Sequence, residues 1–212
     1  MKRRRPRRIS QSGLKRHPLL TLVLVLVALA AMADRAGWLG QRPSARTVTP
    51  DDRSDVERYH QQRFRVVKVV DGDTLDVDAP DGSAPTTRVR LWGVDTPEVA
   101  GGGRGEMHYG PEASAYAKRL LTDQSVRLEL VTDRKTRDRY GRLLAYVRLD
   151  NGEMFNEMLI ASGHAYADPR FNHPRRDRMA QLEETARAKR VGLWNQAKPT
   201  DGPAWRQRLS SD

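Results

Sequence analysis

Residues 64–77 read FRVVKVVDGDTLDV and carry the signals of a β-hairpin. The segments 64–70 and 74–77 are rich in β-branched residues, and the turn-forming triplet DGD at 71–73 separates them. A hairpin of this kind places two carboxylates in one tight turn. This stretch therefore sets the start of the fold and also offers a first candidate site.

The rest of the chain adds three strands and three helical segments to this hairpin. Further strands are expected at 86–92, 126–131 and 143–149. Pro111 fits the first turn of a helix, and two later apolar stripes end near Gly163 and Gly192. Five strands with helices after the third strand and at the end predict an α+β fold, a β-barrel of the OB-fold type with three packed helices.

Composition excludes several classes of protein. The chain has 212 residues and no Cys, which rules out a disulfide scaffold, a thiol nucleophile and a cysteine zinc site. A hydrophobic share of 38% supports one core but not a multispanning membrane protein. The net charge of +11 is mostly local, because residues 1–17 contain eight Lys and Arg and no acidic residue, leaving +3 for the remainder.

The N-terminus is expected to direct export. An apolar run at 19–33 follows the basic segment and ends in the small residues AMA, as in a secretory signal peptide cleaved before Asp34. An uncleaved anchor extending through residues 19–39 is the alternative. Either form places the C-terminal part outside the cytoplasm, in a secreted, periplasmic or membrane-anchored protein, because positive charge stays inside.

The leader at 1–33 is expected to be followed by a polar linker at 34–62. The folded domain is expected at 63–196, and a polar tail at 197–212. Nothing in the sequence requires more than a monomer.

Candidate chemistry is concentrated in two acidic turns and two arginines. The sequence DTPE at 95–98 forms a second acidic cluster after DGD at 71–73, with Arg90 on the intervening strand and Arg142 before a later strand. Taken singly, each is an ordinary turn or a solvated arginine. Together they supply what metal-assisted phosphodiester hydrolysis needs: carboxylates for a hard cation, an acid–base group and guanidinium groups for phosphate.

Several segments, in order, resemble the staphylococcal (micrococcal) nuclease family, also called thermonuclease-like. The resemblance covers roughly residues 64–195. It is carried by VVDGDT (69–74), RLWGVDTPE (90–98), YGPEASAYAK (109–118), DRYGRLLAYV (138–147), FNEMLIASG (155–163) and AKRVGLW (188–194).

The resemblance implies one Ca²⁺ ion and a ligand set for it. Asp73 and Asp95 match carboxylate ligands, and Thr96 matches a residue that contributes its backbone carbonyl. Asp71 matches a supporting carboxylate beside the metal.

The resemblance also implies catalytic and substrate-binding residues. Glu98 matches the general base or water-orienting group, and Arg90 and Arg142 match the pair that contacts the scissile phosphate. Arg139 and Tyr140 match residues that contact the nucleotide. The implied activity is cleavage of DNA and RNA with little sequence preference, leaving 3′-phosphate ends.

Some aromatic positions are not fixed by the resemblance. The base-stacking aromatic is either Tyr166 or Phe171, whereas Trp92 and Trp194 are expected in or near the core. Two other functions remain as alternatives. One is an OB-fold module that binds nucleic acid without cleaving it; the other is a tethered envelope protein whose barrel binds a protein partner.

Overall fold

The computed structural model describes residues 50–100, 105–196, 198 and 201–209. The expected leader and the first part of the expected linker, residues 1–49, lie outside these residues. No helix within the described ranges is long and apolar enough to cross a bilayer.

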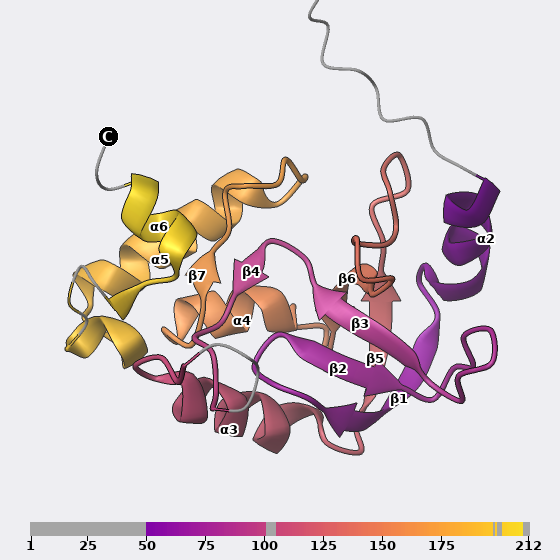
Figure 1. The fold of residues 1–212 in the computed structure, drawn as a ribbon, viewed down its shortest axis with the longest axis horizontal. Helices are drawn as coiled ribbons and strands as arrows, with labels where there is room; N and C mark the ends of the chain where they lie inside the picture. The colour runs from indigo at the N-terminus through magenta and orange to yellow at the C-terminus, as the bar shows by residue number, and fades with distance from the viewer. Residues whose placement is uncertain (1–49, 101–104, 197, 199–200, 210–212) are drawn as a thin grey trace, which may run out of the picture. The chain divides into compact units, whose positions relative to one another are not determined.

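Five strands form a closed barrel, as the sequence predicted (Figure 1). Around the barrel the order is β1-β2-β3-β6-β5, with β5 pairing back to β1. All neighbours are antiparallel except β3 and β6, which run parallel. The strands are β1 (Arg63–Val69), β2 (Thr74–Val77), β3 (Thr87–Leu91), β5 (Ser125–Glu129) and β6 (Leu143–Arg148).

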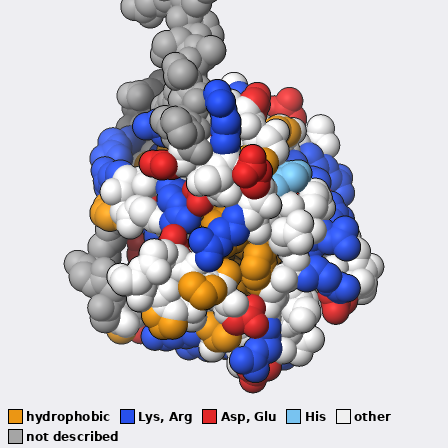
Figure 2. Space-filling model, turned by 90° about the vertical axis from the view of Figure 1, so that its right-hand side faces the viewer, with side chains coloured by type: hydrophobic (Ala, Val, Ile, Leu, Met, Phe, Trp, Pro, Cys, Tyr) orange, Lys and Arg blue, Asp and Glu red, His pale blue; other side chains and the backbone are white. Residues whose placement is uncertain are grey.

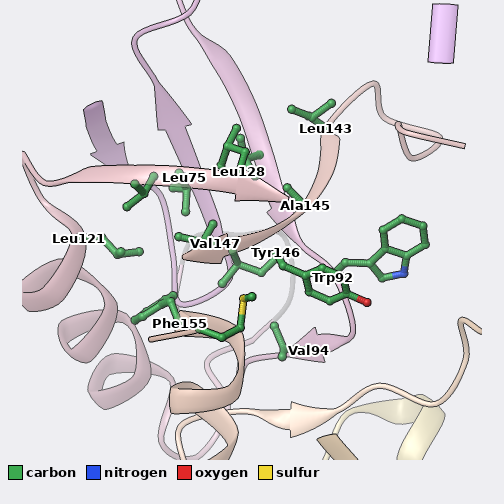
Figure 3. Packing of buried hydrophobic residues seen from close by; sticks show 14 of the residues in the cluster. Leu75, Trp92, Val94, Leu121, Leu128, Leu143, Ala145, Tyr146, Val147 and Phe155 are labelled. Atoms are coloured by element: carbon green, nitrogen blue, oxygen red, sulfur yellow. The ribbon is translucent and has the colours of Figure 1, made fainter. Parts of the chain in front are cut away.

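The alternation of side chains along β3 separates the core from the site. Val89 and Leu91 are buried inside the barrel, while Arg88 is exposed and Arg90 is partly buried on the other face. Figure 3 shows the apolar side chains that fill the interior, with Trp92 beside Tyr146 at one side.

The first two of the three expected helices pack against the barrel, the third packs against the second, and a small second sheet lies beside them. The helices are α3 (Gly110–Leu121), α4 (Phe155–Ala161) and α5 (Arg176–Ala188), and a 3₁₀ turn, η1, covers Gly192–Asn195. The small sheet pairs β4 (Val94–Asp95) with β7 (Tyr166–Ala167). These two strands, of two residues each, were not expected from the sequence, because they are too short to show alternation.

The prediction of a polar linker over residues 34–62 is wrong for its second half. That half forms helix α2 (Pro50–Tyr59), which packs onto the barrel. Tyr59 is fully buried, and its hydroxyl lies 3.0 Å from Thr87 Oγ1. Asp52 accepts hydrogen bonds from the amide (2.8 Å) and hydroxyl (3.0 Å) of Thr136. Polar composition misled the prediction, because this helix buries carboxylates that find their partners on a distant loop.

The expected polar tail is also wrong, because it contains helix α6 (Ala204–Leu209). Its Trp205 is 7% exposed and joins Tyr166 and Leu193 in a second apolar cluster. Figure 1 shows α6 lying beside α5, at the opposite side of the described domain from α2.

We expect Arg137→Ala to lower the free energy of unfolding by about 2 kcal/mol, because it strands two carboxylates that lose their cation. Arg137 bonds to Asp55 at 2.8 Å and to Asp81 at 2.6 Å, and thereby joins α2 to the loop before β6. Chemical denaturation at neutral pH measures the change.

The matched control is Arg127→Ala, which removes an exposed arginine from β5 and should cost no more than about 0.5 kcal/mol. Equal stability of the two variants would mean that α2 contributes little to the fold.

Candidate functional site

The two acidic turns predicted from the sequence meet in space. Asp73 Oδ2 accepts hydrogen bonds from the amide (2.8 Å) and the hydroxyl (3.0 Å) of Thr96. Gly72 allows this approach, since a Cβ at that position would lie 2.7 Å from Thr96 Cγ2. Asp71 completes the turn by accepting the amide of Asp73 at 3.0 Å. The DGD and DTPE segments therefore form one structural unit.

Arg90 joins the two carboxylates that the sequence proposed as metal ligands. Its Nη1 lies 3.0 Å from Asp73 Oδ1 and its Nη2 lies 2.9 Å from Asp95 Oδ1. The Arg90 side chain is only 13% exposed. Burial alone lowers the pKa of Arg90, but the charges of Asp73 and Asp95 outweigh it, and the pKa lies above its usual value. Arg90 is therefore a permanent cation between two carboxylates.

Negative charge is concentrated around this arginine. Burial, followed by the charge of Asp73, raises the pKa of Asp71 to about 6 and the pKa of Asp95 to about 6. Arg90 lowers both pKa values but does not cancel these effects. The carboxylates thus repel one another more than one guanidinium can offset, and a further cation would relieve the repulsion.

The residues fit a hard divalent cation. Asp73 and Asp95 offer carboxylate oxygens, and Thr96 adds a backbone carbonyl, all of the type that Ca²⁺ prefers. Within the described residues, no three His, Cys, Asp or Glu side chains are grouped closely enough to hold a metal ion.

Arg142 reaches the same site from the loop before β6. Its Nη1 lies 3.4 Å from Thr74 Oγ1, and that hydroxyl donates to Asp73 Oδ1 at 3.2 Å. Asp138 orients Arg142 by accepting from its Nε at 2.7 Å and from its amide at 3.0 Å. The side chain is 27% exposed, so part of the guanidinium remains available to a ligand.

Arg139 and Tyr140 lie on the outer part of that loop. Tyr140 is 66% exposed, with the guanidinium carbon of Arg139 at 4.7 Å and that of Arg142 at 5.5 Å from its ring centroid. The three side chains form one exposed group next to the acidic turns. The structure therefore brings both nucleotide-contact candidates close to Arg142.

Glu98 follows Asp95 by three residues in a segment whose backbone is held in place. Its side chain is partly buried, and its carbonyl accepts the amide of Met107 at 2.9 Å. The same carbonyl packs on Gly110, where a Cβ would lie only 2.2 Å away. The start of α3 thus fixes the backbone position of Glu98.

The structure separates the two candidate base-stacking aromatics. Tyr166 is 3% exposed and sits edge-on against Trp194, so its ring is not available to a base. Phe171 is 49% exposed and can stack. The expectation for Trp92 is confirmed, because it is 6% exposed within the main core, and Trp194 packs partly buried against the second cluster.

Two residues that contact the site were missed by the sequence analysis. Trp205 donates its indole N–H to Asp95 Oδ2 at 2.6 Å, and Arg170 lies 3.3 Å from the same oxygen. Trp205 is a lone aromatic in a polar segment, and Arg170 is one of many arginines in its neighbourhood. No local pattern marks either of them.

Comparison with known proteins agrees with this geometry. Residues 88–196 match the family described as Staphylococcal nuclease homologue. The thermonuclease of Staphylococcus hyicus is 40% identical over 147 residues, which are 69% of this chain and 83% of that protein. The thermonuclease of Staphylococcus intermedius is 42% identical over 136 residues, covering 63% and 76%.

A protein of Escherichia coli named as an uncharacterized endonuclease is 31% identical over 144 residues, covering 68% of this chain and 84% of that protein. The barrel fold and these relatives together place the chain among nucleases of the OB-fold class. The chain belongs to the staphylococcal nuclease family.

We expect Gly110→Ala to destabilise the protein by about 1–3 kcal/mol, although alanine favours helices, because its Cβ clashes with the Glu98 carbonyl. Displacement of Glu98 should also lower turnover. Thermal unfolding and a nuclease assay measure the two effects. Gly105→Ala is the control, since a Cβ there meets nothing within 4 Å; a stabilised Gly110→Ala would contradict the contact.

In the absence of divalent cations, we expect the Tm to fall by a few degrees as pH rises from 4 to 7, because Asp71 and Asp95 lose their protons over this range. The pKa values of Asp71 and Asp95 rise on folding from 3.8 to about 6. The folded state therefore binds more protons in this window and loses that advantage as pH increases. Thermal unfolding of the wild type and of Asp95→Asn across this pH range measures the effect. The Tm of the variant should depend less on pH. Equal dependence of Tm on pH in the two proteins would refute the raised pKa of Asp95.

Proposed function

We propose that this chain is an exported, Ca²⁺-dependent, sugar-nonspecific nuclease that hydrolyses phosphodiester bonds of DNA and RNA and leaves 3′-phosphate ends. The observation that carries the proposal is that Arg90 pairs with both Asp73 and Asp95. Arg142 is linked to Asp73 through the hydroxyl of Thr74. Membership of a family that contains thermonucleases supports it.

In this proposal Asp73, Asp95 and the carbonyl of Thr96 hold one Ca²⁺ ion, and Asp71 supports the turn that carries Asp73. When bound, the ion supplies positive charge that neutralises a phosphate oxygen. Arg90 pairs with the same two carboxylates, and a cation bound there would compete with it for them and would leave its guanidinium donors for a phosphate.

The chain's own side chains perform the remaining chemistry. Glu98 accepts a proton from the attacking water, whose oxygen forms the new bond to phosphorus. Arg90 and Arg142 bind phosphate oxygens with planar, charged hydrogen-bond donors and stabilise the charge that develops there. The bond from phosphorus to the 5′ oxygen breaks, and Arg142 assists this leaving group. The phosphate remains on the 3′ side.

Substrate binding without sequence preference follows from contacts to phosphate and to base faces. Arg139 and Tyr140 offer a charge and an exposed ring, and Phe171 offers a second ring. On the face shown in Figure 2, Lys and Arg side chains are interspersed with Asp and Glu. This face of the described domain is therefore not uniformly basic.

We propose that the protein acts as a monomer. The hydrophobic leader at 19–33, either cleaved or retained as an anchor, supports its export. An extracytoplasmic location suits a weak oxygen site, because Ca²⁺ there reaches millimolar concentrations.

We expect Glu98→Gln to reduce kcat by about 10²–10⁴-fold while Tm stays within a few degrees of the wild type, because one general base is removed without loss of volume. Cleavage of single-stranded DNA and of RNA by the full chain, with Ca²⁺, with Mg²⁺ and with chelator, measures activity and metal preference. Arg142→Ala should lose activity to a comparable degree.

The control is Glu112→Gln, which changes an exposed glutamate on α3 and should retain full turnover. Tight binding of single-stranded DNA without cleavage under every condition would favour the nucleic-acid-binding module instead. Full turnover of Glu98→Gln would refute the assigned base.

A further inference from the structure

Helix α6 returns the end of the chain to the proposed metal site. Trp205 lies 110 residues after Asp95, and its indole N–H donates to Asp95 Oδ2 at 2.6 Å. Trp205 is 7% exposed, so water does not compete freely for this bond. A short charge-assisted hydrogen bond of this kind fixes both the position and the rotation of the carboxylate.

A second donor acts on the same oxygen. Arg170 Nη2 lies 3.3 Å from Asp95 Oδ2, and its guanidinium is bound to Asp168 at 2.6 Å. The guanidinium carbon of Arg170 lies 4.8 Å from the Trp205 ring centroid. Trp205 and Arg170 therefore form one unit on Oδ2. The other oxygen, Oδ1, lies on the side of Arg90 at 2.9 Å.

The helix that carries Trp205 is anchored to the strands that carry Asp95. Arg206 binds Glu183, with Nη1 at 3.0 Å from Oε2, and the same Oε2 accepts the amide of Ala167 at 2.8 Å. Ala167 belongs to β7, which pairs with β4, where Val94 is opposite Ala167 and Asp95 opposite Tyr166. Trp205, the donor, and Asp95, the acceptor, are thus linked through the same contacts between α6, α5, β7 and β4.

We infer that Trp205 and Arg170 are positioning residues that hold Asp95 by its Oδ2 and leave Oδ1, which lies on the Arg90 side, for the cation. This inference rests on the proposed function, in which Asp95 is a ligand of Ca²⁺. Carboxylates that bind metals are commonly oriented by hydrogen bonds from outer residues, and losing such a partner weakens metal binding about 10–100-fold. The expected catalytic domain ended at residue 196, so the contribution of Trp205 comes from outside it.

The test is isothermal titration of Ca²⁺ into the full chain and into Trp205→Phe, which keeps an aromatic ring and removes the N–H. We expect the Kd for Ca²⁺ to rise about 10-fold, with Tm in chelator within a few degrees of the wild type and kcat restored at saturating Ca²⁺. Arg170→Lys, which keeps the positive charge and loses the planar guanidinium donors, should also weaken binding and provides an independent variant.

Trp194→Phe is the matched control. Its indole nitrogen is buried and has no hydrogen-bond partner among the described residues, and its ring packs against the same cluster. Removing this N–H disturbs the cluster without touching Asp95. The Kd of Trp194→Phe for Ca²⁺ should therefore stay within twofold of that of the wild type.

The outcomes separate the inference from the proposed function. If the wild type binds Ca²⁺ and both Trp205→Phe and Arg170→Lys bind it equally well or more tightly, the positioning role is overturned and the metal site stands. Weakening by Trp194→Phe as large as that by Trp205→Phe also overturns it, because packing alone would explain the loss. A wild type that binds no Ca²⁺ overturns the proposed cation, and the inference with it.

Discussion

The structure around the site depends on one buried cation between two carboxylates. Arg90 holds Asp73 of the first hairpin and Asp95 of the small sheet within 3.0 Å of its terminal nitrogens. Two carboxylates brought this close repel each other, and burial strengthens the repulsion. Without the guanidinium, the barrel and the β4–β7 sheet would meet at an unfavourable concentration of negative charge. The divalent cation that we propose for this site would relieve the same repulsion.

Local signals were sufficient to predict the barrel, and the motifs named the candidate residues Asp73, Arg90 and Asp95 that the structure brings together. The DGD turn, the alternation around Arg90 and the glycine after each apolar stripe are short-range patterns, and each formed the expected element. The order of motifs then related separate segments to a known family. The meeting of the DGD and DTPE turns could not come from spacing alone, because it depends on Gly72 packing against Thr96.

The two helices outside the expected domain were missed for different physical reasons. Helix α2 buries Asp52 and Asp55, and such burial is favourable only because Thr136 and Arg137 are supplied by a loop about 80 residues away. Helix α6 is six residues long and contributes one large aromatic side chain. In both cases the stabilising partner is distant in sequence, so no window of residues contains the information.

The two added helices also show that the unit defined by similarity is shorter than the unit that folds. The family match begins at residue 88, after the hairpin that carries Asp73, and ends at residue 196, before α6. The N-terminal helix braces the loop of Arg142, and the C-terminal helix contacts Asp95. Boundaries drawn where resemblance fades would therefore cut through the supports on both sides of the site. A chain cut at residue 196 would keep all the candidate site residues and lose the indole N–H that donates to one of them.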